Sequence, residues 1–194
     1  MLEGLKLSLL DRLWLKGLGV RFRGWANIHL PTCTLRVALV DGWLLAQCTP
    51  KGTILINRSL LGKDDLVLRY VVLHELAHRE SISRPIFYII PFLAVAILAM
   101  IGPYALLIPV AVLTAFLTSW VAELCAEAGC AKKMGFKEFI EARESLTREY
   151  PAQPLFFRLY HPPDRLVLAF CRLAATNTHM RIQNCKIIQG RKQV

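Results

Sequence analysis

One uncharged run dominates the hydrophobic pattern of the chain. From Pro85 to Ala122 there are 38 consecutive residues without Asp, Glu, Lys or Arg. A buried helix of a soluble domain rarely needs more than about 14 such residues, whereas a membrane-spanning helix needs about 20. Gly102-Pro103, a strong turn signal, divides the run in two. The pattern therefore predicts a transmembrane hairpin over residues 85–122. The alternative is a buried hydrophobic hairpin in a soluble protein.

Before this run, three short apolar segments bounded by turn residues predict strands. They cover residues 35–40, 43–48 and 53–57. Asp41-Gly42, between the first two, is a hairpin signal. An edge strand of such a sheet could bind an extended polypeptide by adding it to the sheet. In residues 1–20 leucines recur at helical spacing, so this amphipathic segment either lies on a membrane surface or covers the domain.

Most of the remaining chain is predicted to be helical, over residues 64–80, 104–135, 137–150 and 161–175. The first of these helices has an N-cap at Asp64 or Asp65, and the last is started by Pro162-Pro163. The basic segment 176–194 is expected to be a loose tail. The expected fold class is mainly α with a small β-sheet, in a single membrane-embedded domain of residues 1–194.

The charge of the chain bears on its partners and its orientation. The net charge is +10, from 24 Lys and Arg against 14 Asp and Glu. No nucleic-acid motif accompanies it, so no nucleic-acid partner is expected. Basic residues instead flank the uncharged run, with Arg79 and Arg84 before it and Lys132 and Lys133 after it. The positive-inside rule then places both ends of the hairpin in the cytoplasm. Cysteines on that side are expected to be reduced.

The helix before the uncharged run carries the sequence HELAH at residues 74–78. Residues four apart lie on one face of a helix, so His74 and His78 can direct a ring nitrogen at one ion. Glu75 follows the first histidine and is placed to act as a general base. Two histidines and a glutamate in this HExxH arrangement are typical of zinc peptidases.

A catalytic zinc ion takes three protein ligands and keeps one position open, so a third ligand is needed. Glu123 is the first charged residue after the uncharged run. A hairpin returns the chain to the side it left, so we expect Glu123 to re-emerge near His74. Glu127 lies one helical turn further on and could accept a hydrogen bond from a ligand histidine. The alternative for both glutamates is that they are solvated charges at a helix end.

Three separated motifs in this order resemble the HtpX and CAAX prenyl-protease superfamily of membrane zinc peptidases. They are HELAH at residues 74–78, ELCAE at residues 123–127 and HPPDRL at residues 161–166. Together with the lead-in to HELAH, the resemblance covers roughly residues 35–175. It implies a gluzincin-like zinc peptidase domain in which the transmembrane hairpin is inserted between the HExxH helix and the helix of the third ligand, Glu123.

The resemblance also implies roles at the third motif. His161 corresponds to a residue that donates a hydrogen bond to the transition-state oxyanion, although it could equally be a helix-entry residue. Arg165 corresponds to an arginine near the active site, with Arg172 as a rival because Arg165 lies closer to His161 than the family spacing. Glu127 stands where the family usually has Asp. The amino-terminal transmembrane helices of the family have no counterpart in this chain.

The sequence thus predicts a membrane-bound zinc endopeptidase that cleaves membrane or membrane-proximal polypeptides on the cytoplasmic side. Zn²⁺ is the expected cofactor, and a polypeptide and the lipid bilayer are the expected partners. The competing hypothesis is a non-catalytic scaffold in which zinc pins the two membrane-flanking helices together. Structural zinc sites usually have four protein ligands. A fourth ligand from Cys125 or Glu127 would therefore favour the scaffold.

Overall fold

The computed structural model describes residues 7–31, 33–62, 64–82, 107–149 and 161–174, and seven positions between 89 and 100. In these residues the protein is mainly helical with a small β-sheet, as the pattern predicts. The sheet is mixed and has four strands, one more than predicted. The main elements are α1 (Leu9–Leu18), β1 (Arg21–His29), β2 (Thr34–Asp41), β3 (Ala46–Cys48), β4 (Ile54–Asn57), the 3₁₀ turn η2 (Arg58–Leu60), α2 (Asp65–Ile82), α4 (Leu107–Met134) and α5 (Phe136–Glu149). Residues 164–174 form a further helix.

The sheet has the order β1-β2-β4-β3, and this corrects one prediction. The hairpin expected at Asp41-Gly42 is wrong, because β2 pairs in parallel with β4 and β3 pairs antiparallel with the other edge of β4. The side chain of Asn57 fixes this crossing by donating to the carbonyls of Gly42 and Leu44, at 2.9 and 2.8 Å. Strand β3 is also shorter than the predicted segment 43–48 and lies at an edge of the sheet.

Strand β1 was not predicted. It pairs antiparallel with β2 over its whole length, with a register shift between Phe22 and Gly24. Eight of its nine residues are exposed or half-buried. Phe22, Ala26 and Ile28 alternate with exposed polar residues, so the period-two pattern that signals a strand is present in the sequence.

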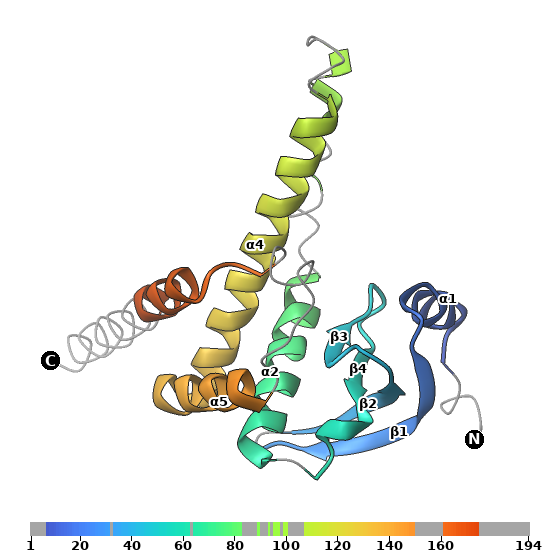
Figure 1. Ribbon diagram of the computed structural model, residues 1–194, viewed down its shortest axis with the longest axis vertical. Coiled ribbons are helices and arrows are strands. Elements are labelled where there is room, and N and C mark those ends of the chain that lie inside the picture. The colour runs from blue at the N-terminus through green and yellow to red at the C-terminus, as the bar shows by residue number, and fades with distance from the viewer. Residues whose placement is uncertain are drawn as a thin grey trace, which may run out of the picture.

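Helix α2 forms the centre of the domain (Figure 1). Its start is fixed by Asp64, whose side chain accepts a 2.9 Å hydrogen bond from the backbone N–H of Leu66. All eight residues from Tyr70 to Ala77 are buried, because α2 packs against the sheet on one side and against α4 and α5 on the other. The main hydrophobic core joins these elements, with Val37, Ile56, Val72 and Phe139 fully buried.

Helix α4 extends well beyond the rest of the domain (Figure 1). By length and composition it could cross a membrane, and none of its most apolar 18-residue window is buried. Within the described residues it is the single helix that meets these criteria, so no second apolar helix completes a hairpin there. The turn expected at Gly102-Pro103 and most of the first expected span lie outside the described residues. Helix α4 ends as predicted at Gly135, whose φ of 91° suits glycine.

Candidate metal centre

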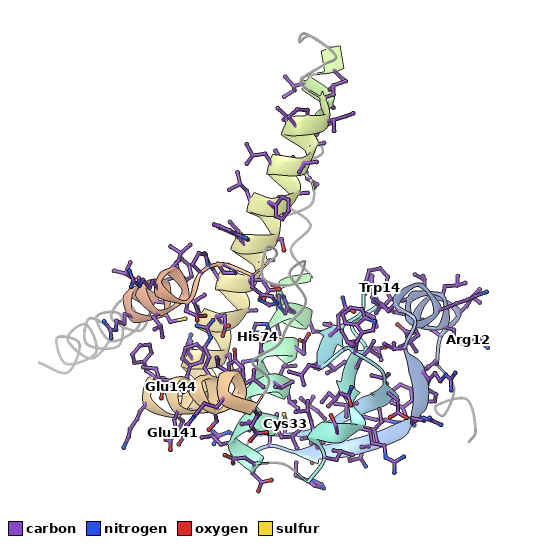
Figure 2. The ribbon with its side chains drawn as sticks, in the orientation of Figure 1. Arg12, Trp14, Cys33, His74, Glu141 and Glu144 are labelled. Atoms are coloured by element: carbon purple, nitrogen blue, oxygen red, sulfur yellow. The ribbon has the colours of Figure 1, made fainter. Side chains whose placement is uncertain are left out.

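Two antiparallel helices, α2 and α4, bring the predicted site residues together. They lie close together at Gly129, where an added Cβ would stand 3.0 Å from the Cβ of Ala77. This glycine lets the α4 backbone lie against the α2 face next to His78. The approach places Glu123 of α4 over His74 and His78 of α2, although 45 residues of sequence separate Glu123 from His78. Figure 2 shows His74 at the middle of this helix pair.

The ligand atoms of His74, His78 and Glu123 form one compact group. The two histidine Nε2 atoms lie 3.1 Å apart. Each of them lies 3.3 Å from one carboxylate oxygen of Glu123. In the described part of the chain, this is the group of His, Cys, Asp and Glu side chains whose geometry could hold a metal ion. Cys125 is not part of it.

The geometry of this group fits a metal ion. Ligands at about 2.0–2.1 Å around a tetrahedral ion lie about 3.3–3.4 Å from one another, close to the separations here. The Oε2 atom of Glu123 is buried and makes no hydrogen bond. Two imidazole nitrogens that face each other at 3.1 Å repel unless a proton or a cation lies between them. Two imidazole nitrogens and one carboxylate suit zinc and other divalent transition metals.

Glu127 lies behind His74, on the side of the ring away from His78. Its Oε2 atom is 3.6 Å from Nδ1 of His74, which is close enough for an ion pair but long for a hydrogen bond. The sequence predicted Glu127 beside one of the two histidines as a hydrogen-bond acceptor; the structure places it beside His74 in an ion pair. Glu127 is 4% exposed and is therefore not a solvated charge at a helix end.

Two residues that the sequence analysis missed hold Glu127 in place. The hydroxyl of Tyr70 lies 3.0 Å from both carboxylate oxygens of Glu127 and donates to them. The Nε atom of Arg143, on α5, lies 3.6 Å from Oε1, and a terminal nitrogen of Arg143 donates to Asp164 at 2.8 Å. Tyr70 precedes His74 by one helical turn, a spacing that could have revealed it. No sequence pattern points to Arg143.

The pKa values of the group reflect this crowding of charges. Burial alone would lower the pKa of His74, but the negative charge of Glu127 and the nearby carboxylate of Glu123 outweigh it and raise the pKa well above its usual range. Burial alone would raise the pKa of Glu123, but the ring nitrogens of His161, His74 and His78 close to its carboxylate hold it well below its usual range. The carboxylates are therefore ionised and attract positive charge into the group.

Glu75 is a buried residue of α2 on the side that faces the edge strand β3. It is 8% exposed. Burial raises its pKa, although the positive charge of the histidines and a hydrogen bond from the backbone of Cys48 partly oppose the shift. Cys48 ends β3, so Glu75 connects the metal centre to the strand at which an extended polypeptide could pair.

Only part of the third motif, HPPDRL, lies beside the centre. His161 lies at the centre, with its Nδ1 atom 3.2 Å from Oε2 of Glu123 and its side chain 40% exposed. The side chains of Arg165 and Arg172 are exposed on the helix of residues 164–174. The arginine beside the centre is Arg143 instead, because the chain brings α5 rather than this last helix against Glu127.

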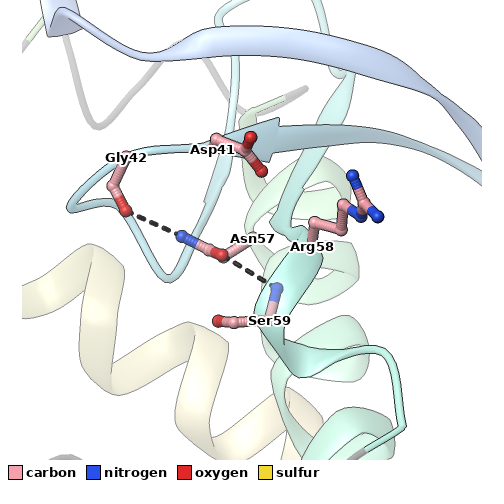
Figure 3. A pocket seen from close by; sticks show the side chains of 5 residues that line it. All are labelled: Asp41, Gly42, Asn57, Arg58 and Ser59. Carbon is pink, nitrogen blue, oxygen red and sulfur yellow. Dashed lines mark hydrogen bonds between the residues drawn. The ribbon is translucent and has the colours of Figure 1, made fainter.

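A separate pocket of about 410 Å³ lies at the other end of the sheet. It is lined by Asp41, Gly42, Asn57, Arg58 and Ser59 (Figure 3). The side-chain amide of Asn57 donates to the backbone carbonyls of Gly42 and Leu44, and its oxygen accepts from the backbone N–H of Ser59 at 3.0 Å. The pocket is therefore formed by a turn that these hydrogen bonds stabilise. None of the metal-centre residues lines it.

Comparison of the chain with protein families, curated proteins and solved structures finds no match.

Proposed function

We propose that the protein is a membrane-bound zinc endopeptidase that hydrolyses peptide bonds of membrane or membrane-proximal polypeptides. The proposal rests mainly on one observation. His74, His78 and Glu123 converge with the spacing of metal ligands, and a buried carboxylate, Glu75, directly follows the first of them. Three protein ligands beside a potential general base favour a catalytic site over a structural one.

The position of Glu127 also supports catalysis over a scaffold. A structural site would recruit a fourth protein ligand. Glu127 lies 3.6 Å from the other ring nitrogen of His74, accepts from the hydroxyl of Tyr70 and forms an ion pair with Arg143. It is thereby committed to orienting His74 rather than to joining the ligand group.

The residues then divide the chemistry among themselves. Zinc held by His74, His78 and Glu123 would supply Lewis-acid polarisation and lower the pKa of water to about 7. Glu75 accepts the proton of the attacking water and returns it to the leaving amine. His161, at the rim of the centre, is placed to donate to the oxygen on which negative charge develops. The free edge of β3 aligns an extended substrate beside Glu75.

The HtpX and CAAX prenyl-protease resemblance and the membrane placement belong to the same proposal. The order of the three motifs supports the resemblance, and helix α4, exposed and apolar, supports a membrane anchor. The basic residues next to the uncharged run favour an active site on the cytoplasmic side.

The substitution Glu75→Gln separates enzyme from scaffold. Full-length protein purified in detergent is assayed for zinc content and for cleavage of casein and of a model membrane protein. We expect Glu75→Gln to keep zinc and lose cleavage by about 100-fold or more, because Gln cannot accept the proton. Glu80→Gln is the matched control, since Glu80 lies on the same helix and is exposed. Wild-type protein that retains zinc in a four-ligand site and cleaves nothing would overturn the proposal.

A further inference from the structure

Two surface helices on opposite sides of α4 carry exposed apolar stripes. On α1, Leu9, Leu10, Leu13 and Trp14 are 66, 59, 60 and 37% exposed. They form two pairs of residues four apart, so they share one broad face. On the helix of residues 164–174, Leu166, Phe170 and Leu173 are 42, 38 and 64% exposed and also recur at helical spacing. Neither stripe is covered by any part of the chain that the structure describes.

Both helices are firmly packed on another face, so their exposed stripes have a fixed direction. On α1, Leu15 is buried and Asp11 accepts hydrogen bonds from the hydroxyls of Thr49 and Thr53, at 2.7 and 3.0 Å. On the other helix, Val167 and Cys171 are each 1% exposed and belong to the main core. In each case the apolar stripe is additional to the residues that hold the helix on the domain.

The two helices lie at the same level of the molecule. Figure 1 places both level with the carboxyl end of α2, where the chain enters the uncharged run, and one on each side of α4. Above this level α4 continues and exposes Ile108, Val112, Leu113 and Leu117. The three exposed apolar surfaces therefore surround the point at which α4 leaves the domain.

We propose that α1 and the helix of residues 164–174 are interfacial helices that lie in the headgroup region of an anionic bilayer. The inference rests on the proposed membrane anchoring of α4. Charge complementarity identifies the lipid, because Arg12 and Lys16 are exposed on α1, and Arg165 and Arg172 are exposed on the other helix. The acidic residues of both helices are engaged within the domain, Asp11 with Thr49 and Thr53 and Asp164 with Arg143. Apolar residues flanked by cations are the pattern of an interfacial helix.

This placement holds the metal centre directly below the membrane surface. It also couples the bilayer to the proposed substrate strand, because Trp14 Nε1 donates to the side chain of Gln47 on β3 at 3.3 Å. Figure 2 shows Trp14 and Arg12 on different sides of α1. Helix α1 would thus orient the edge of β3 relative to the lipid surface, which suits a polypeptide that leaves the bilayer.

Photocrosslinking to lipid tests the inference in the full-length protein. The photoreactive residue p-benzoylphenylalanine replaces Leu10, Phe170, Leu113 or Leu61, one at a time. The protein is reconstituted in nanodiscs that contain phosphatidylserine, and lipid adducts are measured by mass spectrometry. Leu113 reports on α4. Leu61 is the matched control, because it is an exposed leucine (37%) next to the start of α2, at the opposite end of this helix from the proposed interface.

We expect adducts at Leu113, Leu10 and Phe170, with about tenfold or more over Leu61 at the two interfacial positions, as for apolar side chains that partition out of water. Adducts at Leu113 alone would overturn the inference while leaving α4 as a membrane anchor. Adducts at one of Leu10 and Phe170 but not the other would overturn the two-sided placement. Crosslinks to a second polypeptide instead of lipid would also refute it. Failure at Leu113 as well would refute the membrane anchor itself.

Discussion

We expect Arg143 to stabilise the fold around the metal centre, and the free energy of unfolding of Arg143→Met tests this. The guanidinium lies 3.6 Å from the carboxylate of Glu127, which is 4% exposed. Methionine is apolar and fills part of the same volume, so it removes the charge without leaving a large cavity. Tyr70 would still donate to Glu127, but the buried carboxylate would lose its cation.

The magnitude follows from the burial of this pair. Loss of one partner from a buried ion pair costs about 3–5 kcal/mol, because the other charge remains buried and uncompensated. The side chain of Arg143 is 18% exposed, so water can partly replace it. We therefore expect Arg143→Met to lower the free energy of unfolding by about 2–4 kcal/mol. For a chain of this length each kcal/mol corresponds to about 2–4 °C, so the midpoint should fall by about 5–15 °C.

Thermal unfolding of the full-length protein in detergent, followed by circular dichroism, measures this change. Arg148→Met is the matched control, because Arg148 is exposed on the same helix and contacts Glu144 and Ser145 of its own turn. In the double variant Glu127→Gln/Arg143→Met the stranded charge is gone, so the two substitutions should cost less together than their separate effects predict. An unfolding midpoint of Arg143→Met equal to that of Arg148→Met would refute this account of Glu127.

Three further predictions concern single residues. Glu123→Ala should weaken zinc binding by about 100-fold or more, because structural and catalytic zinc sites need at least three protein ligands. Competition with a chelator measures this change, and Glu144→Ala, the control, should leave zinc binding unchanged. Asp11→Asn should destabilise the fold by about 1–3 kcal/mol at neutral pH, because Asp11 accepts charge-assisted hydrogen bonds. Burial alone would raise the pKa of Asp11, but hydrogen bonds from Ser8, Thr49 and Thr53 lower it below its usual value of 3.8. The stability difference between wild type and Asp11→Asn, measured by denaturant titration, should therefore vanish as the pH falls through the folded pKa. Gly129→Ala should lower the unfolding midpoint because its Cβ meets Ala77, whereas Gly17→Ala, with open space around it, should raise the midpoint through helix propensity worth about 0.5–1 kcal/mol.

The parts of the site that the sequence predicted depend on local spacing. His74 and His78 share a helical face because they are four residues apart, and Asp64 caps that helix because a carboxylate accepts from a free amide at an N-terminus. Glu123 could be predicted for a different reason. An uncharged run of 38 residues is long enough to leave and return, so the first charge after it was expected near the helix before it.

The parts that the sequence did not predict depend on contacts between distant elements. The position of β4 between β2 and β3 is set by pairing across the sheet, whereas Asp41-Gly42 reports only a local bend. Strand β1 carries a period-two pattern, but Gly24 and Trp25 weaken that pattern, and its pairing with β2 is what establishes it as a strand. Arg143 is one of several arginines on charged helices. Only the packing of α5 against α2 and α4 distinguishes it from Arg165, which the family resemblance favoured.

The buried charges of the centre give an independent reason to expect a bound cation. Glu123 and Glu127, each with a lowered pKa, place a carboxylate at each ring nitrogen of His74, and Arg143 is the permanent cation that contacts Glu127. One negative charge is therefore in excess within a region shielded from water, where uncompensated charge is costly. A proton on His74 can compensate this excess, which agrees with the raised pKa of that residue. A metal cation can compensate it as well and at the same time satisfies the buried oxygen of Glu123. Charge balance and ligand geometry, which are separate properties of the site, thus favour the same occupant.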